Sequence, residues 1–536
     1  MNADLVLTGG AVFAAGGPEA VAVQEGRIAG VGSARDARGW TGAGTRVLEL
    51  EGRTVLPGFQ DAHLHPPHGG LAGAQCYLFD AGTREQCLDA VARYAAEHPE
   101  LEWIVGGGWS IDSFAGGTPS RGDLDAVVPD RPVFLDNRDG HGGWVNSQAL
   151  ALAGVTAATP DPPDGRIERE PTGEPQGTLH EGAMNIVAQL LPPTTQTEWE
   201  KAILRAQAEL HALGITAWQD AAVTADTYPA YLALAGRGAL TMRMEGNLLW
   251  ERGHGDGQLE ELVARRDAAA IGRLRLRGAK IFVDGVLENF TGAVLEPYVG
   301  TDNDGLSMHE PDELAQMVTA LDAHGFQVHM HTIGDRAVRE ALDATEAARR
   351  ANGARDRRFH LAHVQLVHPD DLPRFAELGV AANVSPYWAC RSDYVTVLTE
   401  PFIGPERSAR MYPFGSLRRA GARLAFGSDW TVSTPNPLLE IEVAVTRAPP
   451  DDRGAEPLLP EEALDLQTAL ATFTGGSAWV NFLDEETGTI EPGKLADLVV
   501  LDRDVLAPGA GPLGDAEVLL TLVEGEAVYT APELGW

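Results

Sequence analysis

The segment LPGFQDAHLH, residues 56–65, is a short apolar run that ends in two histidines one residue apart. Because side chains alternate across a β-strand, His63 and His65 point to the same side of such a strand and can bind one metal ion together. Three later segments also place an imidazole or a carboxylate near the end of a β-like run: VHMHTIGD (328–335), HLAHVQ (360–365) and AFGSDW (425–430). Four strands of this kind predict a barrel whose strand ends converge on one metal centre.

The chain contains enough β-like segments to close such a barrel. They are residues 56–65, 214–221, 240–249, 279–285, 326–333, 358–365, 379–386 and 422–429. Helical segments, for example 311–325 and 335–353, separate several of them. This alternation predicts an α/β fold, a TIM-like (β/α)₈ barrel over residues 56–486.

Two parts of the chain lie outside this repeat. Residues 1–55 alternate short β-like runs with Gly-rich turns, and residues 487–536 have the same texture, so we expect a small antiparallel sheet there. Residues 66–213 separate the first two barrel strands, and an insertion of that length is usually functional. Because it leaves the carboxyl end of the first strand, the insertion at 70–210 can fold over the metal site as a lid.

The composition favours a soluble enzyme that acts on a small molecule. Lys plus Arg number 41 and Asp plus Glu 77, which gives a formal net charge of −36 and argues against nucleic acid or an anionic membrane as a partner. The chain has no apolar run of about 18 residues and no basic start before its first apolar residues. Its three cysteines follow no metal-binding spacing. We expect a cytoplasmic protein, with a homodimer as the assembly to test.

Seven blocks of the sequence, in order along nearly the full chain, resemble one enzyme family. They are residues 56–63, 140–150, 280–285, 328–338, 360–365, 427–430 and 488–502. Together they resemble the amidohydrolase superfamily and, within it, the YtcJ-like branch, amidohydrolase family 3, which includes N-substituted formamide deformylase. The resemblance implies a metal-dependent barrel enzyme. It also implies that residues 1–55 and 487–536 meet in one β-sandwich beside the barrel.

The family blocks select ligands where alternation alone does not. His329 and His331 share a face of their strand, and the block places the ligand directly before Thr-Ile-Gly-Asp, at His331. His329 is then a residue behind the ligands or one that faces the substrate. In HLAHVQ the same alignment selects His363. We expect His360 to point to the other side of a regular strand and to serve in packing.

Asp429 ends the last predicted strand. A carboxylate in that position can contact the metal and also accept a proton from water, so Asp429 is our candidate for both ligand and general base. The alternative is that Ser428 and Asp429 only cap the helix that follows. The place of Asp429 in the family order favours the catalytic role.

Lys280 is the most informative remaining candidate. In many amidohydrolases a lysine at the end of the fourth strand reacts with carbon dioxide, and the carbamate bridges two metal ions; KIFVDG resembles that block. The reaction needs a neutral amine, and burial lowers a lysine pKa in that direction. The alternative is an ordinary barrel lysine paired with Asp284 or Glu288. The expected ligands of one or two zinc-type divalent ions, with two favoured, are His63, His65, Lys280, His331, His363 and Asp429.

Residues near the predicted site are expected to address the substrate. His141 and Trp144, in the insertion, match the family's Gly-His-x-x-Trp-Val-Asn block, and a histidine there can hold a carbonyl oxygen or an oxyanion. His141 therefore joins Asp429 as an expected catalytic residue. The residues expected to line the substrate pocket are Trp109, Trp144, Asp284, His329 and Trp388.

These residues predict a metal-dependent hydrolase of a carbon–nitrogen bond. By resemblance, the first candidate substrate is an N-formyl or other N-substituted amide. A deaminase that acts on an amidine-like carbon is an alternative, because the same barrel supports that reaction. A non-catalytic binding or regulatory protein on this scaffold is a second alternative, although a protein of that kind has no chemical need for the full ligand set.

Overall fold

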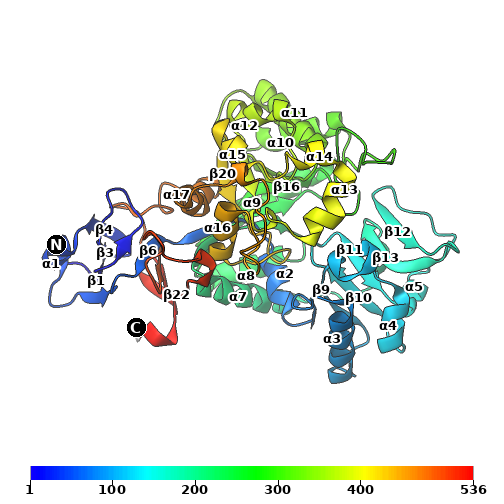
Figure 1. Ribbon diagram of the computed structural model, residues 1–536, viewed down its shortest axis with the longest axis horizontal. Coiled ribbons are helices and arrows are strands. Elements are labelled where there is room, and N and C mark those ends of the chain that lie inside the picture. The colour runs from blue at the N-terminus through cyan, green and yellow to red at the C-terminus, as the bar shows by residue number, and fades with distance from the viewer. Residues whose placement is uncertain (1, 535–536) are drawn as a thin grey trace.

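The computed structural model describes residues 2–534, and its elements form three parts along the long axis of the molecule (Figure 1). Both chain ends contribute to the sheets at one end, the barrel lies in the middle, and the insertion lies at the other end (Figure 1). No helix within residues 2–534 is long and apolar enough to cross a membrane.

The middle part is a near-closed barrel of eight parallel strands, which confirms the predicted fold class. In barrel order the strands are β7 (Phe59–Leu64), β14 (Ile215–Val223), β15 (Arg243–Leu249), β16 (Leu274–Phe282), β17 (Gln327–Thr332), β18 (His360–His363), β19 (Ala381–Val384) and β20 (Arg423–Phe426). The last and first strands meet through residues at their carboxyl ends. The Asp429 amide donates to the His63 carbonyl at 2.7 Å, and the His65 amide donates to the Trp430 carbonyl at 2.8 Å.

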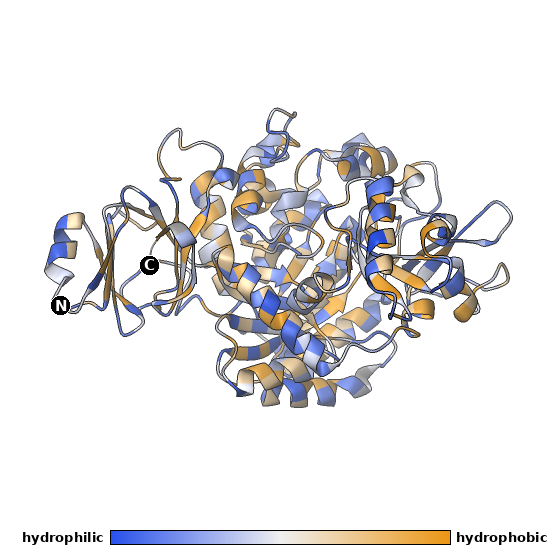
Figure 2. Cartoon of the chain, turned by 90° about the horizontal axis from the view of Figure 1, so that it is seen from below, coloured by the Kyte–Doolittle hydropathy of each residue, from blue (hydrophilic) through white to orange (hydrophobic). Residues whose placement is uncertain are grey.

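Helices that follow the strands cover the outside of the barrel. They include α7 (Gln196–Ala212), α8 (Tyr228–Gly236), α9 (Leu259–Ala268), α10 (Pro311–Ala323), α11 (Asp335–Asn352), α12 (Leu372–Leu378), α15 (Phe414–Arg419) and α16 (Pro437–Thr446). Helix α7 begins with a capping box in which Thr195 and Glu198 satisfy each other's free backbone amides. It buries Trp199, Ile203 and Leu210, which lie on one helical face. Hydrophilic and hydrophobic residues alternate along such outer helices (Figure 2).

The two chain ends build neighbouring sheets on one shared core. One sheet has the order β4 (Arg27–Gly32), β3 (Ala20–Gln24), β1 (Leu5–Thr8) and β5 (Arg46–Glu49). The other has the order β2 (Ala11–Val12), β6 (Thr54–Pro57), β21 (Leu498–Leu501), β22 (Val518–Val523) and β23 (Glu526–Thr530). Leu7 and Val21 of the first sheet and Val500 and Leu520 of the second are buried in the same cluster.

The insertion folds around a sheet of its own. Its strands, in sheet order, are β12 (Gly165–Arg169), β13 (Pro175–Glu181), β11 (Gly142–Val145), β10 (Val133–Asn137), β9 (Ile104–Trp109) and β8 (Cys76–Tyr77). The helices α3 (Arg84–Glu97), α4 (Arg121–Val127) and α5 (Ser147–Leu152) accompany it. Tyr394, in a π-helix at Tyr394–Thr399, joins the barrel side to this part, because its hydroxyl lies 3.3 Å from both Ser110 Oγ and the Ile111 amide.

Candidate metal centre

Three buried side chains from different strand ends form a compact group that can hold a metal ion. His63, His363 and Asp429 each offer one ligand atom, and these atoms lie within 4.8 Å of one another. Asp429 Oδ1 is 3.2 Å from His63 Nε2 and 3.2 Å from His65 Nε2, while Asp429 Oδ2 is 3.9 Å from His363 Nδ1. One carboxylate therefore faces three imidazoles at the carboxyl ends of the strands.

Two residues of the metal centre have backbone conformations that residues other than glycine rarely adopt. The φ angles of His363 and Asp429 are +72° and +53°. Such conformations cost of order 1–3 kcal/mol and are typically kept at functional sites, where they aim a side chain. Gly427 is required next to them, because a Cβ atom there would lie 2.4 Å from His63 Cβ. Asp429 does not cap the next helix, since Asn436 caps α16.

Electrostatics give the group the charge state that a divalent metal needs. Burial alone would raise the pKa of Asp429, but the His63 and His363 rings and hydrogen bonds from His63 and His65 outweigh it and hold that pKa well below its usual value. Burial, with a further contribution from Lys280, lowers the pKa of His63 to about 3. A buried carboxylate beside neutral imidazoles is a donor set that fits zinc or a similar ion.

Lys280 lies two residues before the end of β16, and its amine is buried. Its Nζ atom is fully buried and has no hydrogen-bond partner among the described residues. Burial lowers its pKa to about 7, against the opposing effect of Asp429. Neither carboxylate suggested as an ordinary partner pairs with it: Asp284 accepts from backbone amides, and Glu288 accepts from Gln365 and Thr399. The centroid of the Phe282 ring lies 4.9 Å from Nζ, but the ring offers no hydrogen bond, so a ligand or a modification would satisfy this buried amine.

His331 is oriented by Asp284 rather than by a substrate. Its Nδ1 atom is 3.1 Å from Asp284 Oδ1, which leaves Nε2 as the free ring nitrogen. Asp284 is fully buried and also accepts from the amides of Ala293, Ile333 and Gly334. Every oxygen of Asp284 is thus occupied, and this side chain, which we expected in the pocket lining, instead fixes the ring of a ligand candidate.

His360 and His329 lie inside the barrel, below the ligand group. His329 is fully buried with Nε2 2.8 Å from His63 Nδ1, so it contacts a ligand instead of facing a substrate. The His360 ring packs on the His329 ring with a centroid separation of 4.0 Å. His360 does serve in packing, but it does not point away from His363 as a regular strand requires. The left-handed backbone of His363 breaks the alternation at the strand end.

His141 extends from the insertion toward the metal centre. Its ring is held by the carboxylate of Glu181, which the sequence patterns do not indicate. Its Nδ1 atom is 2.9 Å from Glu181 Oε2, and its ring centroid is 5.5 Å from that of His331. Glu181 Oε1 accepts in turn from Thr291 Oγ1 at 2.8 Å, which ties the insertion to the barrel. Burial alone would lower the pKa of His141, but the Glu181 carboxylate outweighs this effect and raises it to about 9.

The three tryptophans expected in the pocket divide between two environments. Trp388 is half-buried and stacks on His363, with ring planes 8° apart and centroids separated by 4.9 Å. Trp109 and Trp144 are fully buried in the core of the insertion, and their indole nitrogens donate to the carbonyls of Leu135 and Ser120. These two side chains therefore support the insertion from within and do not line the metal centre.

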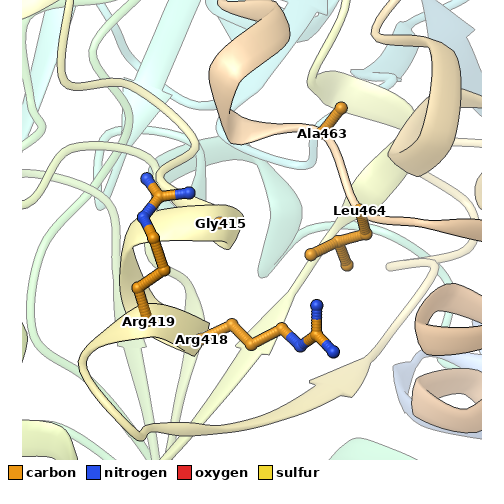
Figure 3. A pocket seen from close by; sticks show the side chains of 5 residues that line it. All are labelled: Gly415, Arg418, Arg419, Ala463 and Leu464. Atoms are coloured by element: carbon orange, nitrogen blue, oxygen red, sulfur yellow. The ribbon is translucent and has the colours of Figure 1, made fainter.

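A small surface pocket elsewhere offers no competing site. It is lined by Gly415, Arg418, Arg419, Ala463 and Leu464 (Figure 3). Helix α15 ends at Arg419, shortly before β20 begins, so this pocket lies toward the amino end of a strand whose carboxyl end leads to Asp429. Both arginines are already paired, with Asp465 and Glu462 respectively, at 3.2 Å.

Comparison with known proteins gives consistent matches over nearly the whole chain. The sequence profile of the amidohydrolase family matches residues 46–529, a range that contains all seven blocks named above. Protein LONG AFTER FAR-RED 3 of Arabidopsis thaliana is 34% identical over 98% of this chain and 92% of its own length. The N-substituted formamide deformylase of Arthrobacter pascens is 30% identical over 95% of each chain.

Among solved structures, a metal-dependent hydrolase from Pyrococcus horikoshii OT3 has the same architecture. The two structures superpose with a TM-score of 0.73 at 25% sequence identity, over 95% of this chain and 99% of the other.

Proposed function

The chain belongs to the amidohydrolase family, and from that premise we propose that it hydrolyses a carbon–nitrogen bond of an amide-like small molecule with the help of bound divalent metal. The observation that carries this proposal is the buried group of His63, His363 and Asp429 at the carboxyl ends of the barrel strands. An N-formyl or other N-substituted amide is the proposed substrate class, supported by the name of the Arthrobacter relative.

The residues proposed to hold the metal come from five strand ends. They are His63, His65, Lys280, His331, His363 and Asp429, with zinc as the proposed metal and two ions as the favoured number. We include Lys280 as a carbamate, formed when its neutral amine adds to the carbon of carbon dioxide and releases a proton. Its burial, the absence of a hydrogen-bond partner among the described residues and its lowered pKa support that step.

When bound, the metal polarises the substrate carbonyl and acidifies a water molecule. Asp429, ionised because its pKa is held so low, accepts the proton of the attacking water and then delivers it to the leaving nitrogen. His141, as an imidazolium held by Glu181, donates a hydrogen bond to the oxygen on which negative charge develops. The balanced products are one carboxylate, formate for a formamide, and one amine.

Metal analysis and product analysis test this proposal together. We expect purified protein to contain one or two divalent ions per chain, and chelation to abolish turnover of N-substituted amides. The expected products are an amine and a carboxylate in equal amounts. Ammonia release with the carbon skeleton retained would identify a deaminase instead. A metal-free folded protein without turnover would favour the binding or regulatory alternative.

Replacing Glu181 by Gln should move the alkaline limb of activity to lower pH. The active imidazolium of His141 exists below its pKa of about 9 and is lost as the pH rises through that value. Without the carboxylate, that pKa falls toward its ordinary value near 6.5. We therefore expect kcat/KM at pH 8 to fall roughly 30-fold, while the loss is small at pH 6.

The pH profile of kcat/KM and the metal content check this expectation. Glu168→Gln is the matched control, because Glu168 pairs with His180 and Arg166 in the same insertion sheet. His141→Ala should lower turnover at every pH below about 9, with metal content unchanged. An unshifted alkaline limb in Glu181→Gln would remove this pair from the mechanism, and loss of metal in His141→Ala would make His141 a ligand.

A further inference from the structure

His63 is held at both of its ring nitrogens. On one side, Nε2 faces Asp429 Oδ1 at 3.2 Å, and on the other side Nδ1 faces His329 Nε2 at 2.8 Å. The His63 and His329 rings are nearly perpendicular, at 77° with centroids 4.7 Å apart. Both side chains are almost completely buried. The plane of the His63 ring is therefore set by one contact on the metal side and one contact on the barrel side.

The barrel-side contact has the chemistry that a histidine ligand needs. A neutral imidazole that offers the Nε2 lone pair to a metal carries its proton on Nδ1, and that N–H needs an acceptor. Among the hydrogen bonds of the described residues, His329 Nε2 is the partner of His63 Nδ1. His329 Nε2 can accept this hydrogen bond when the proton of the His329 ring lies on Nδ1.

His329 is in turn fixed by a chain of contacts that returns to the first strand. The His360 ring packs on it, and His360 Nδ1 lies 3.2 Å from Asn383 Nδ2. The same Asn383 amide donates to the carbonyl of Ala62 at 2.7 Å, directly before His63. The contacts thus cross the barrel interior from β7 through β17, β18 and β19 and back to β7.

We propose that His329 is a positioning residue that fixes the tautomer and orientation of His63, with His360 and Asn383 as its support. The inference rests on the proposed metal centre, and it adds a residue that holds no metal and touches no substrate. It predicts that His329 contributes to metal affinity through the acceptor at its Nε2 position.

A packing role alone does not account for these side chains. His329 Nδ1 and His360 Nε2 are buried without a hydrogen-bond partner among the described residues. Burying a polar atom without a hydrogen-bond partner is costly, and an apolar side chain of similar size would fill the same space without that cost. The hydrogen bond to His63 supplies the reason for an imidazole at position 329.

The test compares metal affinity in variants that keep or remove the acceptor. His329→Gln retains an oxygen near the position of Nε2, whereas His329→Leu has none, and the amide of His329→Asn is one bond too short to reach. We expect His329→Leu and His329→Asn to bind zinc about 10- to 100-fold more weakly than wild type in competition with a chelator. We expect His329→Gln to stay within a few-fold of wild type.

His211→Leu is the matched control for loss of a buried histidine, because the two ring nitrogens of His211 bond to Thr241 and to the Ile215 carbonyl, away from the metal candidates. The melting temperature of the metal-free protein should fall in both His211→Leu and His329→Leu. The zinc affinity of His211→Leu should stay at the wild-type value. If His329→Leu does not fold, the Gln and Asn variants make the same comparison between two amides. Equal affinity of wild type and His329→Leu, or equally weak Gln and Asn variants, would overturn the inference. A wild-type protein that binds no metal would instead overturn the metal centre itself.

Discussion

Asp429→Asn should leave a folded protein that keeps most of its metal but turns over substrate at least about 100-fold more slowly. The asparagine side chain can still offer one oxygen to the metal in place of Asp429 Oδ1, which faces His63 and His65. It cannot accept the proton of the attacking water. Because the pKa of Asp429 is held well below its usual value, the wild-type group is ionised throughout the neutral range, so the loss should persist at every pH in that range.

The measurements are kcat with an N-substituted amide and metal content per chain. Asp371→Asn provides the matched control, since Asp371 is also a buried carboxylate but pairs with Arg339 and Arg374 on the outside of the barrel. Its replacement should affect stability and not the chemical step. A near-normal kcat in Asp429→Asn would show that Asp429 does not transfer the proton. A folded variant that has lost its metal would show that Asp429 acts as a ligand only.

The strands of the barrel could be predicted, because the sequence pattern of a buried strand lies within a few consecutive residues. Each of the eight predicted segments overlaps an observed strand, since runs of apolar residues bounded by turns are visible in short windows. Alternation correctly places His63 and His65 on one side of β7, where both approach the same oxygen of Asp429. The side that a strand-end side chain faces can therefore be predicted from the sequence where the strand stays regular.

The remaining features depend on information that a short window does not contain. Alternation states which side of a strand a residue faces but not how deep in the barrel it lies, so it cannot separate His329, below the ligands, from His331, beside them. The left-handed backbone at His363 reverses the expectation for His360. Glu181 approaches His141 from 40 residues away in a sheet of the insertion, and no local pattern marks that pairing.

Lys280→Ala should bind fewer metal ions than wild type and lose most activity. If the Lys280 amine is a carbamate shared by two divalent ions, its removal takes an anionic ligand from between two positive charges, whose repulsion is then less well compensated. Metal content and kcat should fall together. The His331 and His363 imidazoles are neutral, because burial holds their pKa values well below normal, so they cannot replace that negative charge.

Chemical rescue separates a missing ligand from a damaged fold. Short carboxylic acids should restore part of the activity of Lys280→Ala, because two carboxylate oxygens can take the place of the two carbamate oxygens in the space that the side chain vacates. Lys280→Arg should resist rescue, since a guanidinium stays charged and fills that space. Rescue should raise metal content in parallel with kcat. Full metal content and activity in Lys280→Ala would contradict the shared-ligand model, and a centre built by His63, His65, His331, His363 and Asp429 alone would then be the better account.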